Sequence, residues 1–108
     1  MGVEIHDNSK EISENIKSAL LRGMEKCGLT AERFAKKLAP YDTGNLRNSI
    51  THEVDDGEPA VYIGTNVEYA PSQELGTINM DANPFLKPAV ADHANTYRKI
   101  IEKELKNG

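Results

Sequence analysis

The sequence of 108 residues has no tryptophan, few other aromatic residues and a single cysteine. With 38% hydrophobic residues there is material for one lean core, so we expect a single domain over residues 1–108. One cysteine excludes an intrachain disulfide and fits a reducing compartment. The amino terminus has no apolar run typical of a signal peptide or a membrane span, and we expect no contact with a membrane.

Positive charge is also in short supply. Thirteen Lys and Arg residues stand against seventeen Asp and Glu, which gives a net charge of −4. Because neutralisation of phosphates supplies much of the affinity for nucleic acid, this balance argues against free binding of nucleic acid through a basic face. Basic residues do recur in the first third of the chain, but acidic residues lie between them, and a solvated helix face explains both.

Motifs for catalysis or metal binding are missing as well. The three histidines lie in different expected elements, and none has zinc-site spacing: His6, His52 and His93. Ser49, His52 and Asp42 have the residue types of a triad, but no nucleophile elbow frames the serine. Cys27 falls on an apolar helix stripe, which indicates a buried structural thiol. We therefore expect no cofactor, no metal and no enzyme.

A long helix is the clearest element that the sequence does contain. Apolar residues recur at steps of three and four at Ile12, Ile16, Leu20, Met24, Cys27, Ala31, Phe34 and Leu38. This stripe predicts one helix from Ser9 to Ala39, with Asn8 and Glu11 as a capping box and Pro40 after its end. The alternative is two helices that break at residues 27–30, since Gly23 and Gly28 each weaken a helix by about 1 kcal/mol.

Strand patterns and a second helix follow. Ile50–Val54 and Val61–Ile63 alternate around a turn at residues 55–59, which predicts a hairpin. Weaker strand patterns lie at Val3/Ile5 and at Ile78/Met80. A final helix begins near Pro88, with an apolar stripe at Val90, Ala94, Tyr97, Ile101 and Leu105. The fold class is therefore α+β: a long amino-terminal helix, an antiparallel sheet of three or four strands, and a carboxy-terminal helix packed on one face of the sheet.

The long helix has a consequence for assembly. Thirty-one residues of helix span about 46 Å, whereas a compact domain of this size has a radius of gyration of about 13 Å. Its own fold cannot cover such a helix completely. Leu21 and Leu29 lie off the apolar stripe, and we expect them to point outward as contacts for a neighbouring subunit. The alternative is that they are two ordinary surface leucines.

Three short segments stand in a fixed order between the helices. They are Pro-Tyr-Asp-Thr-Gly-Asn-Leu-Arg-Asn-Ser-Ile at residues 40–50, Tyr69-Ala70 with Glu-Leu-Gly-Thr at 74–77, and Asn-Pro-Phe-Leu-Lys-Pro-Ala at 83–89. In this order, with helical flanks, they resemble the tail-completion and head–tail joining (neck or minor tail) proteins of long-tailed bacteriophages. Pro71, directly after Tyr69-Ala70, departs from the family pattern.

The resemblance implies roles for the matched positions. Thr43 and Gly44 shape the exit from the long helix, while Leu46 and Ile50 anchor the segment in the core. From the residues themselves we expect an ionic contact between Arg47 and Glu74, within or between subunits; the alternative is two unrelated solvated charges. We also expect the loop from Thr77 to Asn83 to order on assembly. The full set of motif and candidate interface residues is Thr43, Gly44, Leu46, Arg47, Ser49, Tyr69, Glu74, Gly76, Thr77, Pro84, Phe85 and Pro88.

The implied function is structural. The family resemblance indicates a virion protein, made in the cytoplasm of the bacterial host, that completes the tail or joins it to the head. Its partners are other neck and tail proteins, a homo-oligomeric ring of its own copies, and DNA that passes through a channel without specific binding. Two alternatives stay open: a small dimeric binding module, and a small hydrolase that uses carboxylates or His52.

Overall fold

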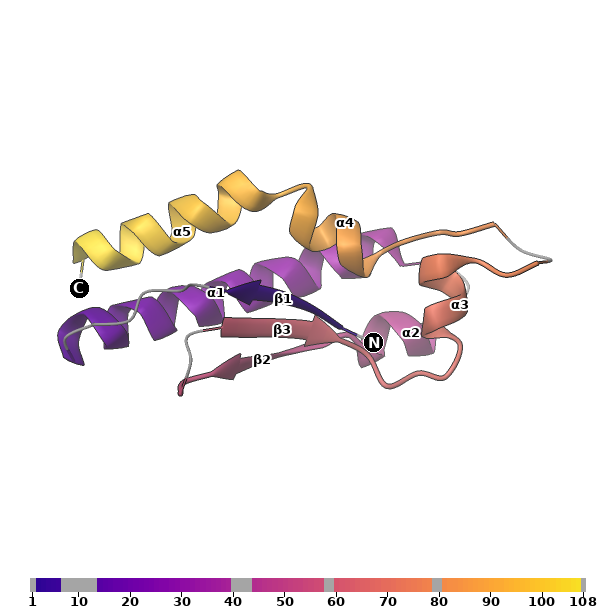
Figure 1. Cartoon of the computed structure of the whole chain (residues 1–108), viewed down its shortest axis with the longest axis horizontal. Coiled ribbons are helices and arrows are strands. Elements are labelled where there is room, and N and C mark those ends of the chain that lie inside the picture. Colours follow the sequence, from indigo (N-terminus) through magenta and orange to yellow (C-terminus); the bar gives the residue numbers. More distant parts are fainter. Residues whose placement is uncertain (1, 7–13, 40–43, 58–59, 79–80, 108) are drawn as a thin grey trace.

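The protein is described by a computed structural model, which covers residues 2–6, 14–39, 44–57, 60–78 and 81–107. The elements run in the order β1 (Gly2–His6), α1 (Glu14–Leu38), α2 (Gly44–Ser49), β2 (Thr51–Asp55), β3 (Ala60–Gly64), α3 (Ala70–Leu75), α4 (Leu86–Ala91) and α5 (Ala94–Asn107). The predicted α+β class, with a long helix, an antiparallel sheet and a carboxy-terminal helix, is confirmed (Figure 1).

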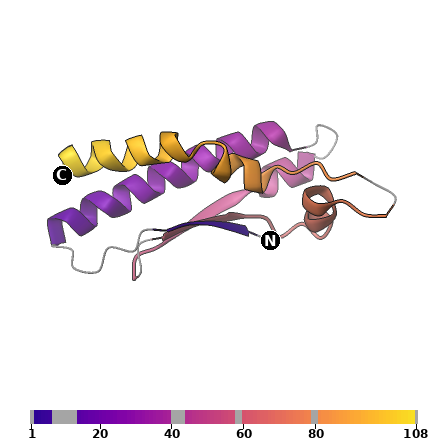
Figure 2. The ribbon, with the colours of Figure 1, turned by 45° about the horizontal axis from the view of Figure 1, so that its top comes forward.

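The sheet has three strands in the order β1-β3-β2, with both neighbouring pairs antiparallel. In the hairpin, which the alternating pattern predicted, Val54 lies opposite Val61. The strand suggested at Ile78 is not formed, because Thr77 makes only an isolated bridge and Ile78 lies in a turn; Met80 is outside the described residues. Figure 2 shows α1 on one face of the sheet, with α5 stacked over α1 on that same side.

Helix α1 is continuous through both of its glycines, so the alternative of two helices is wrong. A Cβ on Gly23 would lie 2.8 Å from Cδ1 of Ile101, and one on Gly28 would lie 2.3 Å from Cδ2 of His52. The glycines therefore allow close approach of α5 on one side and of β2 on the other. The proposed capping box, the first residues of the predicted helix and Pro40 lie outside the described residues.

The middle of the predicted stripe on α1 forms the core, and its ends do not. Leu20, Met24 and Cys27 are at most 2% exposed. By contrast, Ile16 and Leu38 are 52% and 41% exposed, respectively. They lie towards the two ends of an elongated molecule, with extents of 51 × 21 × 20 Å and a radius of gyration of 15.1 Å. The expectation that the fold cannot cover the whole helix is confirmed.

The single final helix predicted from Pro88 onward is wrong in detail, because the structure has two helices with a turn at residues 92–93. The turn resets the phase of the second helix. Tyr97 is buried on the face that packs against α1, but Ala94 and Leu105 are exposed, and Glu104 takes a buried position that the stripe did not include.

The structure has two further short helices that the sequence pattern did not predict. Residues 44–49 form α2, and Leu46 and Ile50, four residues apart, both enter the core as predicted. The strand that follows begins at Thr51. Helix α3 contains Pro71 in its first turn, a position that needs no amide donor, so this departure from the family pattern is compatible with a helix.

Within the described chain, no helix is both long and apolar enough to cross a membrane.

Candidate assembly surfaces

The carboxylate of Glu74 joins two segments that are 11 to 13 residues apart in the sequence. Glu74 lies at the end of α3, where it is 5% exposed. Its Oε1 accepts the backbone N–H groups of Phe85 and Leu86, each at 2.9 Å, and its Oε2 accepts that of Lys87 at 3.0 Å. These are the amides at the start of α4, which no preceding turn of that helix can satisfy. One buried side chain thus caps α4 and ties it to α3.

The loop between α3 and α4 is closed at its base by backbone contacts. The N–H of Asn83 donates to the carbonyl of Gln73 at 2.7 Å, beside the Glu74 contacts. Gly76 has φ = 79°, the only positive φ among the described residues, and its N–H donates to the Ser72 carbonyl at 2.8 Å. Glycine is needed there because this backbone conformation is strained for other residues. The second and third sequence segments therefore fix the base of one loop.

Apolar side chains are exposed beyond that base. Leu75 is 73% exposed and Ile78 is fully exposed at 101%, while Phe85 at the base is completely buried. Figure 1 shows this loop extending from one end of the molecule, past α3. We define Leu75 and Ile78 as the apolar loop patch. The sequence pattern singled out the loop from Thr77 to Asn83 but not Leu75, the last residue of α3.

A basic pocket lies near the carboxy-terminal end of α1. Four cationic side chains line a cavity of about 390 Å³: Arg33, Lys36 and Lys37 from α1, and Arg47 from α2. Lys36 Nζ also lies 3.5 Å from Oε1 of Glu32. Within one chain, the carboxylate of Glu74 accepts three backbone amides in place of Arg47, and the alternative of a contact between subunits stays a prediction.

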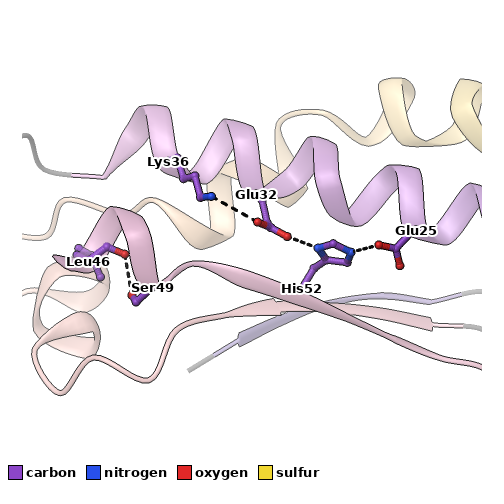
Figure 3. A network of polar contacts seen from close by, with 6 residues as sticks. All are labelled: Glu25, Glu32, Lys36, Leu46, Ser49 and His52. Atoms are coloured by element: carbon purple, nitrogen blue, oxygen red, sulfur yellow. Dashed lines mark hydrogen bonds and ion pairs between the residues drawn. The ribbon is translucent and has the colours of Figure 1, made fainter. Parts of the chain in front are cut away.

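Ser49 has a structural position at the end of α2. Its hydroxyl donates to the Leu46 carbonyl at 2.7 Å (Figure 3). It also contacts the hydroxyl of Thr65, which follows β3. The hydroxyl of Ser49 therefore bonds to Leu46 and Thr65 and not to His52, as a catalytic triad would require. Asp42, the third residue of that possible triad, lies outside the described residues. Ser49 therefore links α2 to the chain beyond the hairpin.

His52 lies between two carboxylates of α1. Its Nε2 is 2.6 Å from Oε1 of Glu25, and its Nδ1 contacts Oε2 of Glu32. Figure 3 shows the imidazole spanning the gap between β2 and α1, with Lys36 continuing the row. Burial alone would lower the pKa of His52, but the hydrogen bonds to Glu32 and Glu25 outweigh it, so the pKa is raised above 6.5. The carboxylates of Glu25 and Glu32 therefore favour the protonated form of the His52 ring.

His52 lies half-buried in β2, within the predicted strand, but its two partners on α1 were not predicted. A signal was present in α1. Glu25, Gly28 and Glu32 are spaced at three and four residues, so they share one helix face, with the glycine between the acids. That arrangement leaves a slot for a ring from a neighbouring strand, flanked by two acceptors.

A second charged group lies between α1 and α5. Glu104, 7% exposed, contacts Nζ of Lys26, and its Oε2 lies 3.5 Å from Nε of Arg22. The hydrogen bond from Lys26 is the main cause that lowers the pKa of Glu104. Two of the basic residues along α1 thus hold α5 in place. Cys27 is buried nearby, as predicted, and burial raises the pKa of its thiol to about 11.

The remaining predicted interface residues are scattered. Leu29 is 52% exposed, as expected, whereas Leu21 is half-buried, so the outward orientation predicted for it is wrong in part. Tyr69 is 38% exposed and precedes α3. Four other positions complete the set: Thr77 and Pro84 are exposed, Pro88 is half-buried in α4, and Thr43 lies outside the described residues. The motif residues do not form one patch.

Two further observations bear on chemistry. Among the described residues, no three His, Cys, Asp or Glu side chains converge as a metal site would require. A cavity of about 190 Å³ lies along the sheet, with Tyr62 and Glu53 among its lining residues. The polar contacts of the described residues instead join elements to one another. Glu74 of α3 contacts α4, His52 of β2 contacts α1, and Glu104 of α5 contacts α1.

Comparison with known proteins gives one match. Residues 4–76, about two thirds of the chain, match the family model described as "Bacteriophage HK97-gp10, putative tail-component". The matched part includes the first sequence segment and the second up to Gly76, and it ends before Thr77 and the third segment. No curated protein and no solved structure shows a significant match. With a match over more than half of its length, the chain belongs to the HK97-gp10-like family of bacteriophage tail components, and its place is in the virion.

Proposed function

We propose that this chain completes the phage tail or joins it to the head through ring-type contacts between its own copies and with neighbouring neck or tail proteins. The apolar loop patch carries the proposal. Leu75, the last residue of α3, is 73% exposed, and Ile78, in the loop that follows, is 101% exposed. Glu74 and Gly76 fix the base of this loop. Apolar side chains held outward on an anchored loop are suited to burial against a partner.

The shape of the chain also supports assembly. The molecule is 51 Å long and about 20 Å across, so it presents distinct surfaces at its two ends. Contacts between different surfaces on successive copies are heterologous, and such contacts close into rings when the rotation allows it. The net charge of −4 is compatible with a channel in which DNA slides without being bound.

No catalytic role is part of this proposal. The hydrolase alternative depended on carboxylates or on His52, and both ring nitrogens of His52 are hydrogen-bonded to glutamates of α1. An imidazole held in this way supports the packing of β2 on α1. A measurement of the oligomeric state, with and without the neck proteins, distinguishes the alternative of a dimeric binding module from the proposed ring.

The test is particle assembly in a phage that lacks this gene. We expect electron microscopy to show separate heads and tails, or tails of irregular end structure, and the wild-type gene to restore whole particles. The variant Leu75→Ser with Ile78→Ser should fail to restore them, whereas Leu105→Ser, 40% exposed on α5, should succeed. Whole particles in the absence of the gene would refute the proposal.

A further inference from the structure

Charge is distributed unevenly around the hairpin. At the end where β2 begins, the basic pocket of about 390 Å³ is lined by cations from α1 and α2. Its volume is many times the roughly 30 Å³ that one water occupies in the liquid, so it has room for side chains of a partner. Lys36 of this pocket contacts the carboxylate of Glu32, which also contacts His52.

Carboxylates gather at the other end of the hairpin. Glu53, Asp55 and Asp56 are exposed in β2 and in the turn that follows it. Oδ1 of Asp55 accepts the N–H of Gly57 at 3.0 Å, which gives the turn a defined conformation. We define Asp55 and Asp56 as the acidic turn.

The two charged surfaces are too far apart to meet within one chain. Five residues of strand span about 16 Å, and Figure 1 shows the acidic turn and α2 at opposite ends of β2. A contact between them therefore requires a second molecule. The contact would be heterologous, because a different surface is used on each copy, and it leaves one basic pocket and one acidic turn open for the next copy.

We propose that the acidic turn of one copy docks in the basic pocket of the next, an inference that rests on the proposed ring. The occupant is a second copy because two adjacent carboxylates are exposed in the turn, and Arg33 and Lys37 are exposed among the four cationic side chains that line the pocket. A long polyanion such as DNA fits less well, because the whole chain carries a net charge of −4 and would repel it.

The physical chemistry of this contact predicts its behaviour. A single exposed ion pair contributes little, but several charges in one pocket add up and also set the orientation of the partner. Salt screens exposed charges over about 8–10 Å at physiological ionic strength. Self-association through this contact should therefore weaken steeply as salt is added.

Charge reversal tests the pairing with the full chain. The pocket variant is Arg33→Glu with Lys37→Glu, both exposed, which leaves Lys36 beside Glu32. The turn variant is Asp55→Lys with Asp56→Lys. We expect sedimentation to show self-association weakened at least about tenfold in each variant at low salt, because like charges then face each other. An equal mixture of the two variants, or one chain with all four changes, should associate as wild type does.

The matched control is Lys99→Glu with Lys103→Glu, which makes the same change of charge on the exposed face of α5 and should leave association unchanged. A covalent test uses Lys37→Cys with Asp56→Cys, since the native Cys27 is buried. Mild oxidation should give a ladder of linked copies, and either single cysteine variant should give at most dimers.

Several outcomes would overturn the pairing: a wild-type chain that stays monomeric at high concentration and low salt, single variants that associate normally, or mixtures that are not restored. Loss of binding to a short DNA duplex in the pocket variant, with unchanged self-association, would make the pocket a nucleic-acid site instead. The outcomes of these association experiments can be distinguished from a failure of the proposed function. If the variants still restore whole particles, the ring stands and only this contact is wrong, whereas particles that need no copy of the gene refute the function itself.

Discussion

Two regions of this molecule are held together in different ways. Along α1, the fold depends on close packing, with glycines that let Ile101 and the ring of His52 approach the helix backbone. At the end with α3 and α4, one carboxylate on three backbone amides joins the elements, and apolar side chains point away from it. Close packing makes α1 and its neighbours a rigid body. At the other end, the hydrogen bonds from the amides of Phe85, Leu86 and Lys87 to Glu74, which we call the clamp, hold the loop at its base without burying its side chains. The regions should therefore respond differently to substitution.

The largest effect is expected at the clamp. Glu74→Ala leaves the amides of Phe85, Leu86 and Lys87 without their acceptor, and the free energy of unfolding should fall by about 3 kcal/mol. Glu74→Gln keeps one acceptor oxygen and should lose less. Denaturant titration measures the loss, and hydrogen exchange should be faster at these amides than in α1.

The exposed Glu68→Ala is the matched control, and it should change neither quantity. Unchanged exchange at Phe85 and Leu86 in Glu74→Ala would show that the capping contacts do not hold α4.

The clamp also shows where prediction from sequence stops. The long helix was predicted because its stripe repeats over seven steps, and the hairpin because its strands alternate around an evident turn. Helices α2 and α3 have six residues each, fewer than two turns, so their periodicity is too short to detect. Glu74 caps a helix that begins eleven to thirteen residues later, and no local rule relates a carboxylate to amides at that distance.

The next effect is expected on the packed side. Gly28→Ala would place a methyl group 2.3 Å from Cδ2 of His52 and 3.0 Å from Cγ2 of Val61, so β2 must move away from α1. Alanine in a helix is intrinsically better than glycine by about 1 kcal/mol, yet overpacking should outweigh this and lower the free energy of unfolding by about 2 kcal/mol. Thermal and denaturant unfolding measure the change.

Ser18→Ala, exposed on the same helix, is the control and should be close to neutral. The added substitution His52→Ala should partly rescue Gly28→Ala, because the clash is with that ring. Increased stability of Gly28→Ala alone would show that the two elements are not in close contact.

A smaller effect should appear with pH. The hydrogen bonds to Glu32 and Glu25 raise the pKa of His52 above 6.5 despite burial, so the folded state binds this proton more tightly than the unfolded state does. Its contribution to stability is then complete below pH 6.5 and is lost as the pH rises through the folded pKa. Denaturant titrations from mildly acidic to alkaline pH should show this fall in the wild type. The difference between wild type and His52→Gln carries the signal, and parallel curves would contradict a paired imidazolium.

The smallest effect on stability is expected where the effect on assembly is largest. Leu75 and Ile78 are 73% and 101% exposed, so Leu75→Ser with Ile78→Ser removes almost no buried surface. The free energy of unfolding should stay within about 0.5 kcal/mol of the wild-type value. Glu74→Ala should also impair assembly, but by releasing the loop, and it lowers stability at the same time. If the serine variant proved as unstable as Glu74→Ala, the loop would belong to the packed body. If it were stable and inactive in particle assembly, the clamp would serve to present apolar side chains to a partner.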